Sequence, residues 1–247
     1  MESMDAFIDR LPKAELHLHL VGSASVPTVL ELRRRHPDGS GVPSSAAELA
    51  AFGTLEHALT CPPEALVGFG LAGIEQARPR FAGQFRSVFA SAIAAGLHSV
   101  PHAGEMSGPA TIAEALDGLH AERIGHGISC MGDPALVARL RESQIPLEVC
   151  PTSNVCTRQV PGLAAHPLPR MLEEGLFVTL NSDDPPMFGT TLTDEYRRAA
   201  SVLGLSRAQL AGLAANGVRA SFLDAAAKQA LLAEIDAVAA GAAGARS

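Results

Sequence analysis

The stretch Leu16-His17-Leu18-His19 decides how the chain is interpreted, because it combines an alternating apolar pattern with two imidazoles. Residues two apart in a β-strand point to the same face, so the histidines share one face and the leucines share the other. The pattern predicts a strand over 14–20 that turns its histidines toward the inside of a barrel and its leucines toward outer helices. Two polar residues on a solvated strand face are the alternative for this stretch taken alone.

Two further polar stretches also follow apolar runs that are typical of strands. One contains His102 and Glu105, and the other contains Asp183 and Asp184. Together with the two earlier histidines they supply three imidazoles and a carboxylate, which is a sufficient set of ligands for one catalytic metal ion. Only a fold that gathers strand ends brings such distant residues together, and a parallel barrel does so. A turn or a helix N-cap is the alternative for the Asp-Asp-Pro-Pro sequence.

The rest of the chain alternates apolar strand-like segments with helical segments, which predicts βαβ units and a parallel sheet. Beyond the strand over 14–20, strands are predicted over 65–71, 97–102, 123–125, 145–149 and 176–181. Helices are predicted over 26–35, 81–95, 110–119, 134–143, 166–174, 193–203, 207–221 and 225–239. The fold class is therefore α/β, a TIM-type barrel that is incomplete, with about six recognisable strands and C-terminal helices.

Length and charge set bounds on what the chain does. Its 247 residues match the length of about 250 that one barrel needs, so we expect a single domain over 1–247. The net charge of −7 argues against a nucleic-acid partner, since such binding depends on Lys and Arg at phosphates. No stretch approaches the ~20 apolar residues of a membrane span, and no signal peptide is recognisable. Four cysteines without a CxxC pair are typical of a cytoplasmic protein.

With these motifs in view, the chain resembles the adenosine deaminase family of metal-dependent barrels. Six stretches carry the resemblance in the family's order, namely 11–19, 70–75, 98–105, 123–127, 147–154 and 180–189. The resemblance implies that one zinc ion per chain is held by His17, His19, His102 and Asp183. It also implies hydrolytic deamination of a 6-aminopurine nucleoside, a small molecule, to the 6-oxopurine and ammonia.

The resemblance further implies one role for each of four other residues. Glu105 is similar to the residue that protonates the purine ring at N1. His126 is similar to the group that orients the attacking water and helps to deprotonate it. Asp184 resembles the residue that contacts the N7 side of the purine, and the backbone of Gly73 resembles the donor to N3.

One departure from the family concerns the substrate. Val21 stands where family members that act on adenosine carry an acidic residue beside the 5′ side of the ribose. A ribose hydroxyl would lose its charged acceptor there, while a larger 5′ substituent would gain room. The chain is in this respect similar to the actinobacterial branch that is associated with aminodeoxyfutalosine, so this nucleoside is favoured over adenosine.

A second departure is an apparent internal deletion near 51–65. The match to the family breaks there, as if two βα units of at least ~60 residues were missing. Strand number fixes the shear and tilt of a barrel, so a barrel that lacks strands has unpaired edges. A homo-oligomer in which another copy of the chain completes the barrel is one alternative. The alternative function is a truncated, non-catalytic paralogue that retains metal or purine binding. A third interpretation, an amidohydrolase that acts on a C–N bond outside purines, is less favoured.

Overall fold

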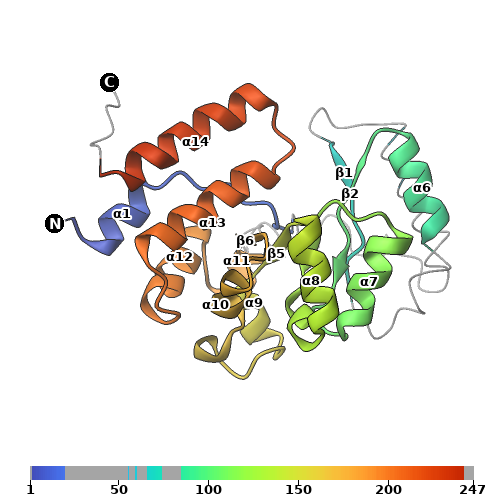
Figure 1. Ribbon diagram of the computed structural model, residues 1–247, viewed down its shortest axis with the longest axis horizontal. Coiled ribbons are helices and arrows are strands. Elements are labelled where there is room, and N and C mark those ends of the chain that lie inside the picture. Colours follow the sequence, from blue (N-terminus) through green and yellow to red (C-terminus); the bar gives the residue numbers. More distant parts are fainter. Residues whose placement is uncertain (1, 20–54, 56–58, 60–65, 74–84, 242–247) are drawn as a thin grey trace, which may run out of the picture. The chain divides into compact units, whose positions relative to one another are not determined.

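The structure is a computed structural model, and it describes residues 2–19, 55, 59, 66–73 and 85–241 (Figure 1). The chain divides into two compact units. The first unit comprises 1–24 and 139–247, and the second unit comprises 25–138. The predicted helix over 26–35, Val21 and all of the predicted deletion except Leu55 and Leu59 lie outside the described residues. The single-domain organisation stays a prediction.

The second unit pairs short parallel strands that alternate with helices. Strand β1 (Gly68–Phe69) pairs in parallel with β2 (His98–Ser99), and β3 (His102–Ala103) pairs in parallel with β4 (Ile124–His126). The connecting elements are α6 (Arg86–Ala94), α7 (Pro109–Gly118) and the 3₁₀ helix η2 (Ile128–Gly132). Parallel strands joined through helices are what the βαβ pattern predicted.

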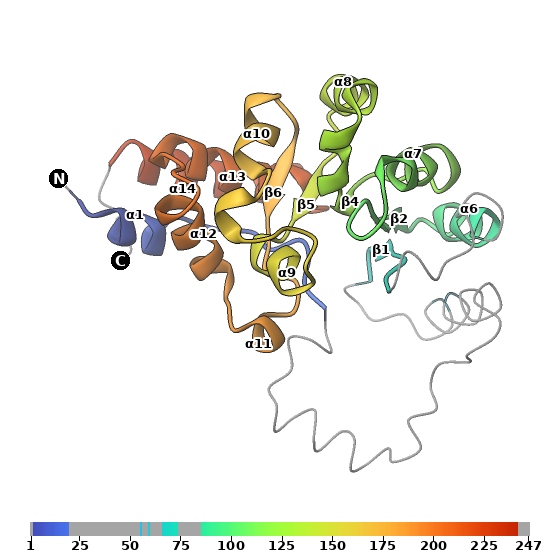
Figure 2. The same cartoon turned by 90° about the horizontal axis from the view of Figure 1, so that it is seen from below.

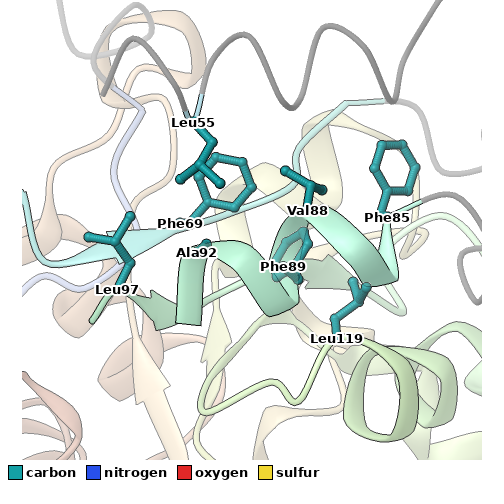
Figure 3. Close-up of a cluster of buried hydrophobic side chains, with 8 residues drawn as sticks. All are labelled: Leu55, Phe69, Phe85, Val88, Phe89, Ala92, Leu97 and Leu119. Carbon is teal, nitrogen blue, oxygen red and sulfur yellow. The ribbon is translucent and has the colours of Figure 1, made fainter. Parts of the chain in front are cut away.

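A cluster of buried apolar side chains forms the core of this unit (Figure 3). Along and just before α6, apolar residues recur with the spacing of one helical face: Phe85, Val88, Phe89 and Ala92. The rings of Phe69 and Phe89 meet edge to face, with centroids 5.2 Å apart. The cluster therefore fixes α6 against β1 and holds the segment that leads to the site residues.

The first unit places parallel strands and a C-terminal helical part in one body. Strand β5 (Leu147–Val149) pairs in parallel with β6 (Val178–Leu180), and both are fully buried (Figure 2). The helices of this unit are α1 (Met4–Arg10), α9 (Pro151–Cys156), η3 (Leu163–Ala165), α10 (Leu168–Glu173), α11 (Pro185–Phe188), α12 (Leu192–Ser201), α13 (Arg207–Ala220) and α14 (Ala225–Ala239). Helix α8 (Pro134–Ser143) leads into this unit. No helix of the described segments is long and apolar enough to cross a membrane.

Local sequence signals predicted several helix bounds correctly. Helices α8 and α14 have the predicted bounds, and α13 begins at a capping box between Ser206 and Gln209. Three short helices, α1, α9 and α11, were not predicted. Helix α9 begins with a proline shortly after β5, and α11 begins with a proline after the loop that follows β6. A proline in such a position is as typical of a turn as of the first residue of a helix.

The predicted strand over 14–20 is wrong for its described part. It makes only an isolated bridge between Leu18 and Asp183, because the side chain of Asn181 accepts the backbone N–H groups of Leu16 and His17. An amide side chain therefore takes the place of a strand partner there. Leu18 is 49% exposed, so it does not pack against outer helices as expected.

The predicted strand over 97–102 is also corrected, since it divides into β2 and β3. The break falls at Val100 and Pro101, and a proline has no N–H to donate to a ladder. The backbone nevertheless stays extended between its neighbours, because the N–H of His102 donates to the carbonyl of Leu71 at 2.9 Å. His102 therefore begins β3 instead of ending the predicted strand.

A buried histidine, His166, joins η3 to α10. Its Nδ1 accepts the N–H of Leu168 at 3.1 Å, and its Nε2 lies 3.2 Å from Oδ1 of Asn154. Burial lowers the pKa of His166 from 6.5 to about 4. The imidazole is thus neutral in the folded protein at neutral pH, with Nε2 carrying the hydrogen toward Asn154.

We expect this histidine to make folding stability depend on pH. Between pH 6.5 and pH 4 the unfolded chain binds a proton that the folded chain does not, so the free energy of unfolding falls as the pH falls through this window. The loss from this residue is about 2 kcal/mol between pH 7 and pH 5. The change His166→Gln removes the titrating group, and urea unfolding at both pH values should show a flatter profile. The control is His98→Gln, whose side chain is 39% exposed, and a profile of His166→Gln as steep as that of the wild type would contradict the expectation.

Candidate metal centre and catalytic residues

The loop that follows β6 holds the segment with the two N-terminal histidines. The N–H of His19 donates to the carbonyl of Asp183 at 3.0 Å, and the N–H of Asp183 donates to the carbonyl of His17 at 3.2 Å. The N–H of Ser182 donates to Oε1 of Glu15 at 2.8 Å, and its hydroxyl donates to the same oxygen. Residues distant in sequence are therefore fixed to one another by backbone and side-chain bonds.

Three donor atoms converge at this point of the first unit. Nε2 of His17 lies 3.4 Å from Oδ1 of Asp183, and Nε2 of His19 lies 3.1 Å from the same oxygen. Ligands about 2.0–2.1 Å from a tetrahedral zinc ion are about 3.3–3.4 Å from one another. Nitrogen and carboxylate oxygen at this spacing are the donor set that zinc prefers, so the residues present fit a divalent metal ion.

A second layer of polar groups surrounds these donors. Nδ1 of His17 lies 3.0 Å from Oε2 of Glu148, and the hydroxyl of Ser153 donates to Oδ2 of Asp183 at 2.6 Å. Burial disfavours the charged imidazole, but the bonds to Asp183 and Glu148 outweigh it and raise the pKa of His17 to about 10. The two carboxylates thus make a buried place for positive charge, which a proton or a metal cation can occupy.

Asp184 is adjacent to Asp183 but lies in different surroundings. It is half-buried and is the residue before α11, yet its side chain makes no capping hydrogen bond. Burial first, and then the charge of Asp183, raise the pKa of Asp184. Its carboxylate also lies within 4.8 Å of donor atoms of His19 and Asp183, so it belongs to the rim of the same cluster. The N-cap interpretation therefore fits its position but not its side chain.

In the second unit, the other predicted residues lie at the ends of β3 and β4. Nε2 of His126 lies 3.5 Å from Oε2 of Glu105, and both side chains are buried. The rings of His102 and His126 have centroids 5.3 Å apart. The backbone of His126 has a positive φ of 63°, which is costly for a residue other than glycine and occurs at functional sites.

Gly104 is the residue that lets the backbone turn between His102 and Glu105. Its φ is +68°, and a Cβ there would lie 2.4 Å from Cδ1 of Ile112. Its N–H donates to the hydroxyl of Thr111 at 2.9 Å, which ties the loop to α7. Glycine is therefore required both by the backbone conformation and by the packing of α7.

We expect Gly104→Ala to lower the free energy of unfolding by about 2–4 kcal/mol, because a strained φ and an overpacked contact add up. Displacement of the Glu105 loop should lower turnover as well. Urea unfolding measures the first effect, and the matched control is Gly108→Ala, where a Cβ meets nothing within 4 Å. Equal stability of the two variants would contradict the steric argument.

The structure thus brings the predicted residues together in two groups. His17, His19, Asp183 and Asp184 meet in the first unit, and His102, Glu105 and His126 meet in the second. Gly73 has a positive φ of 102° and is exposed, and its predicted contact with a purine stays a prediction. Val21 lies outside the described residues.

Sequence reasoning gave no role in the site to Glu148, Ser153, Asn181 and Glu15, although each lies in a stretch that carries the resemblance. Glu148 carried a signal, because a carboxylate within an apolar strand is costly unless it has a buried partner. Asn181 and Glu15 carried no such signal in the sequence. They bind backbone N–H groups whose positions only the folded chain defines.

The chain is similar to known proteins. A family model described as adenosine deaminase matches residues 41–238. Aminodeoxyfutalosine deaminase of Streptomyces avermitilis is 51% identical over 233 residues, which cover 94% of this chain and 61% of that protein. The enzyme of the same name from Streptomyces coelicolor is 52% identical, with 94% of this chain and 57% of that protein covered. The chain therefore spans about three fifths of the length of these curated relatives.

Solved structures are similar as well. Adenine deaminase from Arthrobacter aurescens superposes with a TM-score of 0.74 at 40% identity, covering 85% of this chain and 66% of that one. An amidohydrolase from Burkholderia ambifaria with bound zinc superposes with a TM-score of 0.83 over 98% of this chain and 96% of that one. Its identity of 21% shows the fold alone. Together these likenesses confirm the predicted fold class, an incomplete α/β barrel with a parallel sheet.

Proposed function

Because the chain belongs to the adenosine deaminase family, we propose that it is a hydrolytic deaminase of a 6-aminopurine nucleoside, with aminodeoxyfutalosine favoured over adenosine. The observation that carries this proposal is the convergence of His17, His19 and Asp183 on one point of the first unit. The names of the curated relatives, which are deaminases, support the class of reaction.

The proposal includes one divalent metal ion, which we take to be zinc. His17, His19 and Asp183 would hold it, and His102 is proposed as the fourth ligand. Imidazole nitrogen and carboxylate oxygen favour zinc over magnesium or calcium. A bound zinc ion supplies Lewis acidity that makes hydroxide available near neutral pH.

The remaining residues are proposed to handle protons and to bind the purine. Glu105 donates a proton to ring N1, which makes C6 an acceptor for the attacking water. His126, 3.5 Å from Glu105, orients that water and takes up its proton. The C6–N bond then breaks: His126 returns its proton to the amino group, which leaves as ammonia, and Glu105 regains a proton from the new hydroxyl group. Asp184 binds the N7 side of the ring from the rim of the cluster, and the backbone of Gly73 donates to N3.

The choice of substrate depends on Val21 and on the relatives. A valine beside the 5′ position offers an apolar surface and no acceptor for a ribose hydroxyl, which favours a nucleoside with a larger 5′ substituent. Both aminodeoxyfutalosine deaminases have higher identity to this chain, over more of it, than the adenine deaminase of Streptomyces coelicolor, which is 47% identical over 64% of this chain. We therefore place aminodeoxyfutalosine first and test adenine beside adenosine.

One observation favours a second candidate function, a non-catalytic paralogue that binds metal or purine. The chain covers only 61% and 57% of its two aminodeoxyfutalosine deaminase relatives, so walls of the substrate site that those enzymes possess can be missing here. Retained metal binding without turnover is the result that this candidate predicts.

The test is the ultraviolet difference spectrum of zinc-loaded protein with aminodeoxyfutalosine, adenosine and adenine in parallel. Loss of the 6-aminopurine band, fastest with aminodeoxyfutalosine, supports the proposal. Faster loss with adenosine or adenine would overturn the choice of substrate. A folded, metal-loaded protein that leaves all three spectra unchanged would favour the non-catalytic candidate.

A further inference from the structure

Strand β5 and helix α9 are consecutive elements of the first unit (Figure 2). The short segment from β5 into the first turn of α9 touches two of the proposed metal ligands. Glu148 lies in the middle of β5, and Ser153 lies in the first turn of α9. The carboxylate of Glu148 is 3.0 Å from Nδ1 of His17, and the hydroxyl of Ser153 is 2.6 Å from Oδ2 of Asp183. His17 and Asp183 lie far apart in the sequence, and this segment contacts both of them.

The burial of the Glu148 carboxylate costs folding free energy, which indicates that this residue has a functional role. Its neighbours Leu147 and Val149 are 0% exposed, and Glu148 itself is 3% exposed. A buried carboxylate destabilises a fold unless a partner compensates it, and the partner here is the imidazole of His17. An apolar residue would suit a fully buried strand better if packing were the only demand on this position.

The side on which Glu148 bonds the imidazole decides what the imidazole can do. In the neutral imidazole of His17, the hydrogen on Nδ1 is held by the carboxylate and the lone pair is on Nε2. That Nε2 is the atom 3.4 Å from Oδ1 of Asp183. Glu148 therefore selects the tautomer and the ring orientation in which His17 can bind a cation.

Ser153 acts in the same way on the carboxylate of Asp183. It is 0% exposed, and its hydroxyl bonds Oδ2, whereas the Nε2 atoms of the two histidines lie near the other carboxylate oxygen, Oδ1. This bond leaves Oδ1 directed at Nε2 of His17 and of His19. The backbone of Asp183 has a positive φ of 66°, a costly conformation that the surrounding contacts must hold in place.

We propose that Glu148 and Ser153 are positioning residues of the metal centre, and that the segment between them sets metal affinity by fixing one imidazole and one carboxylate together. The proposal rests on the metal site of the proposed function. It adds that this affinity depends on two residues that do not themselves contact the metal. Loss of an outer partner of this kind weakens metal binding by about 10–100-fold.

The experiment compares Glu148→Gln, Glu148→Leu and Ser153→Ala with the wild type. Zinc dissociation constants are measured by competition with a chromophoric chelator, and the visible spectrum of the cobalt-loaded protein reports the ligand geometry. A third readout is the difference in melting temperature between zinc-loaded and chelator-treated protein. The matched control is Glu195→Gln, which alters a carboxylate with 0% side-chain exposure that bonds Thr190, Arg198 and the N–H of Thr152 instead of a metal ligand. The amide oxygen of glutamine can still accept the N–H of Thr152, so the segment from β5 to α9 keeps this contact in the control.

We expect Glu148→Leu and Ser153→Ala to raise the zinc dissociation constant by about 10–100-fold, and Glu148→Gln to raise it less because the amide oxygen still accepts from Nδ1. The cobalt spectra of these variants should change, and the stabilisation by zinc should shrink. Glu195→Gln should lower the melting temperature without these effects. Absence of zinc binding by the wild type would overturn the proposed metal site itself. If the wild type binds zinc and the Glu148 and Ser153 variants bind it with the same affinity, only the positioning role is overturned. The same holds if Glu195→Gln weakens zinc binding as much as those variants do.

Discussion

The Glu105→Gln variant is expected to lose turnover by about 10²–10⁴-fold while it still binds zinc. Glutamine has nearly the same shape as glutamate but has no proton to donate to the purine ring. The buried side chain of Glu105, 3.5 Å from Nε2 of His126, is placed to exchange protons within a water-poor environment. Turnover is followed by the loss of the 6-aminopurine band, and zinc content is measured on the same sample.

The control for this variant is Glu122→Gln. Oε2 of Glu122 lies 2.8 Å from Nδ1 of His98, so the same unit contains a second histidine–glutamate pair, with both side chains more exposed. This control should keep wild-type turnover. Retention of turnover by Glu105→Gln, or an equal loss in both variants, would refute the proposed role of Glu105. Loss of zinc from Glu105→Gln would assign the residue to the metal centre instead.

The proposed ligand residues were found from local patterns in the sequence. Alternation at 16–19 predicts that His17 and His19 share one face, and the Asp-Asp pair follows an apolar run that becomes β6. These residues do meet in the first unit, and their role as metal ligands stays a prediction. The residues that support them were not predictable in this way. Ser153 is an ordinary helix-start residue in sequence, and only the fold shows that its hydroxyl reaches Asp183.

The difference between local and long-range signals also explains which elements of the fold were predicted correctly. Helix α14 depends on a cap at Asp224 and on residues within one turn, so its bounds could be read from the sequence. The extent of a strand depends on partners elsewhere in the chain. The region 14–20 has the periodicity of a strand, but Asn181 takes its backbone donors, and the described part is left with one bridge.

The second large effect is expected for Asp183→Asn, which should raise the zinc dissociation constant by at least about 100-fold and abolish turnover. Asparagine keeps the size of the side chain and an oxygen that can accept from Ser153. It loses the negative charge that faces the imidazoles of His17 and His19 at 3.4 and 3.1 Å. The charge, not the shape, is therefore what the substitution removes. Chelator competition measures the affinity, and addition of excess zinc tests whether turnover returns.

Asp184→Asn is the matched control, because the two carboxylates are adjacent in sequence and their oxygens lie in one cluster with His19. Asp183 is bonded to Ser153 and faces two imidazoles, whereas Asp184 is half-buried at the rim. We expect Asp184→Asn to keep zinc affinity within a few-fold and to raise KM, as loss of a contact with the purine would. If Asp184→Asn loses zinc as completely as Asp183→Asn, both carboxylates hold the metal and the division of roles between them is wrong. If only Asp184→Asn loses zinc, the two roles are exchanged.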